Sequence, residues 1–241
     1  MSLQCPSLLS DHASDLCRAI DHYCERTGPE LDAELVNAFT NGAFLVGAVI
    51  AWRLQAQTPQ SPTRTYIRVL IVAMATVGIG SFIFHTVGTR WAEWADVIPI
   101  LVFMLLYLWF VLTHLFGWPT LGRAVALAVF CAATFMLEAR VPGDVLWGGA
   151  LYIPTILSFI AIGTVLKRRA HPAANAMLAA IAVFFAAFAA RSSDMAVCDA
   201  FPLGTHFLWH LLNATLLYLL VRLAILKVPS LAVRPAPAVA A

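Results

Sequence analysis

The sequence has 241 residues, of which 61% are hydrophobic and 12% are charged. Soluble domains carry roughly 25% charged residues, so this composition excludes a water-soluble globular protein. The 15 Lys and Arg residues nearly balance the 13 Asp and Glu residues and form no basic block. The sequence therefore lacks the cluster of basic residues that binds nucleic-acid phosphates, and we expect no nucleic-acid partner.

The polar segment of residues 1–33 comes first. Its apolar residues from Leu9 to Cys24 recur at helical spacing, which predicts either a short helix on the membrane surface or a cap docked on the rest of the protein. It lacks the basic start and the continuous apolar run of a signal peptide. Membrane insertion is therefore expected to depend on the segments that follow.

Seven stretches are long and apolar enough to cross a bilayer, which takes about 20 residues. Short connections with Pro and Gly separate them. We predict an all-α membrane protein, a seven-transmembrane helix bundle over residues 34–228, with a kink at Pro154 and a disordered, Pro- and Ala-rich tail over 229–241. The predicted spans are Glu34–Arg53, Tyr66–Thr86, Trp94–Phe116, Thr120–Leu137, Val145–Leu166, Ala173–Ala190 and Thr205–Leu226.

The charge distribution predicts the orientation. With the N-terminus outside, ten of the 15 Lys and Arg residues lie at the inner ends of the spans, which the positive-inside rule favours, so the C-terminus is predicted to be cytoplasmic. All 13 acidic residues then lie on the outer side, as expected of a face that binds cations or performs catalysis. We expect a bacterial inner-membrane protein with its site facing the periplasm; a lumenal site in an organelle membrane has the same topology.

Five polar residues from three distant spans share one depth. Ser81 and His85 are one turn apart at the end of the second span, Asp96 is near the start of the third, and His206 and His210 open the seventh. Because these spans alternate in direction, all five fall in the outer half of the bilayer. Ionisable groups inside membrane spans are costly, so each is a candidate for function.

A zinc site explains this set. His85, His206 and His210 can supply three imidazole ligands and leave a fourth position for water, which is typical of catalytic zinc. Asp96 would then act as the general base and Ser81 as a hydrogen-bond donor to an oxyanion. Taken singly, each residue also has an ordinary structural reading, such as a hydrogen bond to a neighbouring helix. Their shared depth favours a zinc-dependent hydrolase.

These residues resemble those of the alkaline ceramidase family, which is related to adiponectin-receptor-like proteins. The resemblance implies a zinc-dependent amidase that cleaves the N-acyl bond of ceramide, with a ceramide-like lipid entering from the membrane. It also implies that Asp96 activates the metal-bound water and that Ser81 lies near the metal. Further matches are Tyr23-Cys24-Glu25-Arg26, Ala33-Glu34-x-x-Asn37 and Gly204-Thr-His-Phe-Leu-Trp-His210.

The resemblance also implies a calcium site near the N-terminus. Glu25 and Glu34 match its ligands, and Asp21 is a candidate with a shift of one residue. His22 and Thr27, however, stand where the family has Asp and Asn. Calcium binding is therefore left open.

Four of the five cysteines lie on the outer side of the predicted topology, and Cys131 lies inside the fourth span. Four cysteines allow three full pairings, among which the sequence alone does not choose. The resemblance implies a disulfide between Cys24 and Cys198, with a local pair of Cys24 and Cys17, or a free Cys24, as the alternatives.

Three other functions fit parts of the pattern. A related hydrolase could act on another N-acyl or ester lipid, and a seven-span receptor could hold a structural zinc. A transporter ranks last, because its polar residues would be spread through the membrane rather than gathered at one end. The oligomeric state does not follow from the sequence.

Overall fold

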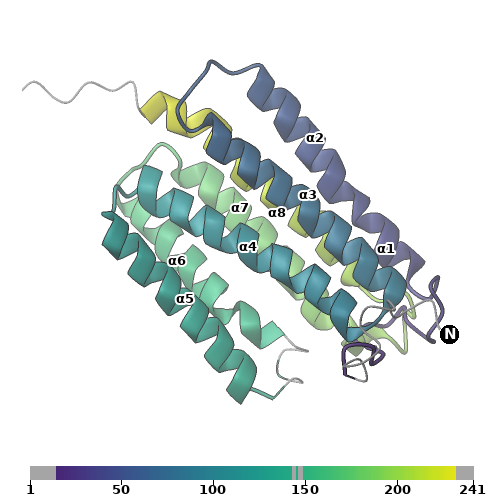
Figure 1. The fold of residues 1–241 in the computed structure, drawn as a ribbon. Coiled ribbons are helices and arrows are strands. Elements are labelled where there is room, and N and C mark those ends of the chain that lie inside the picture. Colours follow the sequence, from purple (N-terminus) through teal and green to yellow (C-terminus); the bar gives the residue numbers. More distant parts are fainter. Residues whose placement is uncertain (1–14, 143–144, 146–148, 232–241) are drawn as a thin grey trace, which may run out of the picture.

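Seven helical spans form a bundle in the computed structural model, which describes residues 15–142, 145 and 149–231 (Figure 1). Each span has at least 20 residues, enough to cross about 30 Å of hydrocarbon at 1.5 Å per residue. The predicted seven-transmembrane, all-α fold is confirmed. The helices are α1 (Leu35–Thr40), α2 (Gly42–Ala56), α3 (Arg64–Val87), α4 (Arg90–His114), α5 (Thr120–Arg140), α6 (Ile153–Arg168), α7 (Ala174–Ser193) and α8 (His206–Leu231).

The first span is two helices, where the sequence predicted one. The break between α1 and α2 falls at Asn41, whose side-chain Nδ2 donates to the Asn37 carbonyl oxygen over 2.9 Å. Such side-chain bonds to the backbone compete with the helical ladder. Gly78 of α3 packs directly against this break. A Cβ at position 78 would collide with the Phe44 side chain and the Asn41 carbonyl oxygen.

The sequence predicted a kink at Pro154 in the fifth span, and the structure places this proline where two helices of the span meet. A short 3-10 helix, η2 (Gly149–Tyr152), precedes α6, and Pro154 lies in the first turn of α6. The missing N–H of a proline costs nothing there, because first-turn N–H groups have no intrahelical partner. Pro99, by contrast, lies inside α4.

Residues 15–33 fold over the end of the bundle where α3 ends and α4 begins. An isolated antiparallel bridge joins Ala19 to Thr89, and the Ile20 N–H donates to the Gly88 carbonyl over 2.8 Å. Residues 15–33 form turns rather than a helix, while the start of the predicted surface helix, residues 9–14, lies outside the described residues. At the other end of the chain, α8 continues to Leu231, three residues into the predicted tail.

The helices α3 and α8 are the most enclosed. In their most apolar stretches 56% and 61% of the residues are buried, against 11% in α5, which lies on the outside of the bundle (Figure 1). The start of α1 and the end of α8 lie at opposite ends of the bundle, as an odd number of spans requires (Figure 1). Which end faces the cytoplasm stays a prediction from charge.

Candidate metal centre

Three histidines meet where α3 ends and α8 begins. His85 lies in the last turn of α3, His206 is the first residue of α8, and His210 follows one turn later. At most 2% of each residue is exposed. Their ring centroids are 4.6 to 5.1 Å apart, and one nitrogen of each lies within 4.8 Å of the other two.

Each of these rings has a buried nitrogen without a hydrogen-bond partner. The atoms are His85 Nε2, His206 Nδ1 and His210 Nε2. An unpartnered buried polar atom is costly, so three together indicate a missing common partner. In the part of the chain that the structure describes, no other group of three His, Cys, Asp or Glu side chains is close enough to hold an ion. The donor set fits a metal ion that binds imidazole, as zinc does.

The opposite nitrogens of two rings are held by oxygen atoms. His85 Nδ1 lies 2.5 Å from Glu34 Oε2, and His210 Nδ1 lies 3.0 Å from the Thr40 hydroxyl. The Thr40 hydroxyl also donates its single proton to the carbonyl oxygen of Val36 or Asn37. It must therefore accept from His210 Nδ1, which leaves the Nε2 lone pair free for a metal. Metal-binding histidines are commonly oriented in this way.

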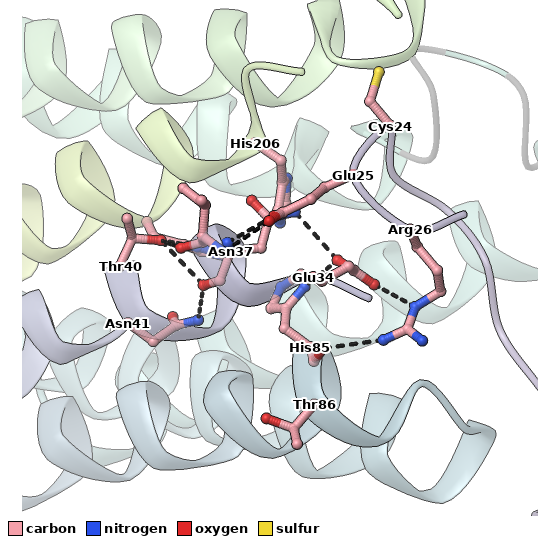
Figure 2. Close-up of polar contacts among 12 residues, drawn as sticks. Cys24, Glu25, Arg26, Glu34, Asn37, Thr40, Asn41, His85, Thr86 and His206 are labelled. Atoms are coloured by element: carbon pink, nitrogen blue, oxygen red, sulfur yellow. Dashed lines mark hydrogen bonds and ion pairs between the residues drawn. The ribbon is translucent and has the colours of Figure 1, made fainter. Parts of the chain in front are cut away.

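Glu34 links His85 to an arginine (Figure 2). Arg26 Nε lies 2.5 Å from Glu34 Oε1, and only 7% of Arg26 and 1% of Glu34 is exposed. Burial alone would raise the pKa of the Glu34 carboxyl, but its bonds and charge interactions with His85 and Arg26 outweigh burial and lower the pKa. Glu34 is therefore an ionised carboxylate between two donors.

The start of α8 is held by Asp194, a buried residue just after α7 that the sequence analysis did not single out. Its Oδ1 accepts from the N–H groups of Thr205 (2.6 Å) and His206 (2.8 Å), and its Oδ2 from the Cys24 N–H (2.9 Å). A carboxylate at a helix N-terminus satisfies unpaired N–H groups and favours the helix dipole. Asp194 therefore sets the position of His206.

The predicted disulfide between Cys24 and Cys198 is present, with Cα atoms 5.4 Å apart. It ties the N-terminal segment to the loop before α8. Beside it the Tyr23 ring stacks on His206, with ring centroids 3.6 Å apart. One face of the histidine cluster is thus covered by a segment that begins more than 170 residues earlier.

Ser81 and Asp96 lie at the same end of the bundle, and both are buried. The helices that carry them approach closely at Gly80, where a Cβ would collide with the Ala95 carbonyl oxygen. The Ser81 side chain is a hydrogen-bond partner of the Asp96 carboxyl, and the charges of His85 and Arg191 lie close enough to act on it. Asp96 Oδ1 is buried and has no hydrogen-bond partner. All five predicted site residues therefore gather at this end.

The three candidate calcium ligands are not brought together. Asp21 is exposed, and both oxygens of Glu25 accept backbone N–H groups at the start of α1, from Val36 (2.7 Å) and Asn37 (2.8 Å). Glu34 faces His85 and Arg26. These residues do not fit a calcium ion, which takes six to eight oxygen ligands.

Comparison with known families finds one match that covers most of the chain. A family model described as ceramidase matches residues 22–234. This range contains every predicted site residue except Asp21. A comparison with curated individual proteins finds no match.

Proposed function

The chain belongs to the ceramidase family, and from that premise we propose that it is a zinc-dependent amidase of the membrane. Its substrate is ceramide, which it cleaves at the N-acyl bond to a fatty acid and a sphingoid base. The observation that carries the proposal is the convergence of three unpartnered imidazole nitrogens at the end of the bundle that also holds Asp96 and Ser81.

His85, His206 and His210 are the proposed ligands. When bound, zinc would supply a Lewis acid that polarises the amide carbonyl and lowers the pKa of a water molecule toward about 7. Three neutral imidazoles leave the charge of the ion uncompensated, which favours both effects. The hydrogen bonds that His85 and His210 donate through Nδ1 to Glu34 and Thr40 support this assignment, because they keep the Nε2 lone pairs turned toward the shared space.

Asp96 is the proposed general base. Its Oδ1 accepts a proton from the attacking water, whose oxygen forms a bond to the carbonyl carbon of the amide. When the carbon–nitrogen bond breaks, the same carboxyl returns the proton to the leaving nitrogen, so that the products are a carboxylic acid and a free amine. The buried, unpartnered Oδ1 supports this role, since no protein donor competes for it.

Ser81 is the proposed donor to the oxygen that becomes negative during attack. It lies one helical turn before His85 on α3, so its hydroxyl and the His85 ring lie on the same face of the helix. A positioned donor of this kind typically contributes on the order of 10² to 10³ in rate.

A mainly apolar cavity supports a lipid substrate. It is enclosed by α4 to α8, and its lining includes Phe103, Tyr107, Tyr152, Phe159, Phe184 and Trp209. On α8 the lining continues from Trp209, the neighbour of His210, to Leu220. Leu220 follows Trp209 by eleven positions, which is about 16 Å along the helix, so the cavity runs from the level of the histidines toward the middle of the membrane. We propose that it holds a hydrocarbon tail.

Product analysis tests the function. The purified protein, with its native zinc, is incubated with ceramide, and fatty acid and sphingoid base are measured by mass spectrometry. We expect the two products in equal amounts, loss of turnover after metal removal by a chelator, and recovery with zinc. An N-acylethanolamine and a cholesteryl ester serve as comparison lipids. Full turnover without metal would contradict the mechanism, and preference for a comparison lipid would contradict the substrate.

We also propose that the histidine end faces the periplasm of a bacterial inner membrane. The excess of Lys and Arg at the other end supports this orientation, and the Cys24–Cys198 disulfide is consistent with an oxidising compartment. The test is labelling of single cysteines in intact cells with a membrane-impermeant reagent. We expect a cysteine at Asp199 to be labelled and one at Arg169 to be protected.

A further inference from the structure

Arg26 is a buried cation beside the candidate metal centre (Figure 2). We infer that its guanidinium is a fixed internal cation that positions His85 through Glu34, and that it takes the role for which the sequence suggested calcium. The inference rests on the proposed metal centre. It makes Arg26 a positioning residue, since Arg26 contacts the ligand and its partner rather than the metal.

The guanidinium holds His85 at two points. Its NH2 donates to the His85 backbone carbonyl over 2.9 Å, and its Nε binds Glu34, whose other oxygen binds the His85 ring. Main chain and side chain of one metal ligand are thus fixed by a single planar group. Arginine suits such a task because its donors form a rigid fork.

The surroundings are shaped to admit this side chain. Gly88, the residue after α3, has φ +62°, a left-handed conformation that favours glycine. A Cβ at Gly88 would come within 2.6 Å of the Arg26 guanidinium carbon. The third donor of the guanidinium, NH1, reaches the Gly28 carbonyl over 3.3 Å. All three nitrogens of the guanidinium are therefore used.

The same contacts leave no place for calcium. Glu34 Oε1 is taken by Arg26, and Glu34 Oε2 by His85 and by Asn37 Nδ2 at 3.2 Å. Both oxygens of Glu25 accept backbone N–H groups. A divalent cation would have to displace these donors and sit beside a positive guanidinium that cannot lose its proton. The centre is therefore expected to work without calcium.

The test measures how fast zinc leaves the purified protein into a colorimetric chelator, in calcium-free buffer or after calcium is added. We expect Arg26→Met to release zinc about 10- to 100-fold faster than the wild type, the usual effect of losing a residue that orients a ligand. Arg26→Lys should lie between the two, because one ammonium cannot span Glu34 and the His85 carbonyl. Calcium should leave the wild-type rate unchanged, because no carboxylate oxygen of Glu25 or Glu34 is free to bind it.

The matched control is Arg90→Met. Arg90 also belongs to an ion pair at this end of the bundle, with Glu93 at 2.8 Å, but its side chain is 39% exposed. We expect wild-type zinc release from this variant, because exposed pairs contribute little. The thermal melting of each metal-free variant separates a general loss of structure from a local loss of zinc.

Two outcomes would overturn the inference: wild-type zinc release from Arg26→Met, or a wild-type protein whose zinc release slows when calcium is added. If Arg26→Met does not fold, Arg26→Lys decides, and zinc release equal to that of the wild type would then count against the inference. The readout does not involve substrate. A protein that holds zinc through Arg26 but leaves ceramide intact would refute the proposed function alone.

Discussion

At the end of the bundle that carries the histidines, the buried side chains include Arg26, Glu34, Asp96 and Asp194. At the opposite end they include Leu70, Leu166 and Ile225. Within the described residues every buried Arg, Asp and Glu lies at the first end. Burying charge is costly unless partners compensate for it. The histidine end is therefore organised around the candidate site, and the opposite end around apolar packing.

Compensation at the histidine end comes from residues far apart in the chain. Glu34 joins Arg26 to His85, and Asp194 joins Cys24 to His206. The opposite end relies mainly on close packing, which in lipid acts through van der Waals contact, with the buried Gln55 amide bonded to the Arg64 carbonyl over 3.0 Å. Substitutions at the histidine end should therefore affect zinc binding and turnover, and substitutions at the opposite end should affect stability.

The largest effect is expected at the ligands. His85→Ala, His206→Ala and His210→Ala should each lose the bound zinc and nearly all turnover, because two remaining imidazoles do not make a tetrahedral site. His114→Ala, at the opposite end, is the control and should keep its zinc. Metal content per protein by mass spectrometry is the measurement. A full zinc content in all three ligand variants would contradict the assignment of these histidines as the ligands.

Asp96→Asn should come next. The general base contributes about 10² to 10⁴ in rate, so turnover should fall by that factor while zinc stays bound. Glu93→Gln is the matched control on the same helix, since Glu93 pairs with Arg90 and His22 at the surface. Kinetics and metal content are measured on the same samples. If Asp96→Asn loses zinc, Asp96 is a ligand instead.

Ser81→Ala should have a smaller effect, on the order of 10² in rate, from the loss of a donor to the oxyanion. Zinc content and melting temperature should not change. A variant as active as the wild type would remove Ser81 from the mechanism. Single-turnover kinetics with ceramide distinguish the chemical step from lipid binding.

Thr40→Val should weaken zinc binding by about 10-fold, the lower end of the range for residues that orient a metal ligand. The hydroxyl that accepts from His210 Nδ1 is lost while the shape is kept. Thr215→Val on α8 is the control, because its hydroxyl bonds only within its own helix, to the Leu211 carbonyl. Zinc competition with a chelator measures both. Equal affinities would mean that the hydroxyl does not orient His210.

Substitutions at the opposite end are expected to have the smallest effect on the site. Leu70→Ala should lower the free energy of unfolding by about 2 to 5 kcal/mol through the cavity it leaves, with the lower values expected where lipid replaces water around the bundle. Zinc affinity and turnover of the folded fraction should be those of the wild type. Changed zinc affinity in this variant would mean that the two ends are not independent.

The two ends of the bundle also differ in how well the sequence predicted them. Continuous apolar stretches predicted all seven spans, and polar residues inside them, such as His85 and Asp96, stood out because lipid penalises them. Arg26, Thr40 and Asp194 gave no comparable signal as parts of the site. Arg26 was only part of a family motif in a non-helical segment, and Thr40 and Asp194 lie at the ends of helices, where polar residues are ordinary. The partners of all three are brought near only by the fold. Pro154 lies in the first turn of α6, which begins one residue before it at Ile153, and nothing in the sequence indicated where that helix begins.

The separation of the histidines along the chain has a consequence for the order of biosynthesis. His85 belongs to the second span and His206 to the seventh, and Cys24 finds Cys198 across 174 residues. A chain that enters the membrane from its N-terminus presents His85, with Glu34 and Arg26 beside it, long before the other two ligands are synthesised. The proposed three-histidine site is therefore complete only after the last helix has been synthesised, so that bound metal would report a fully inserted chain.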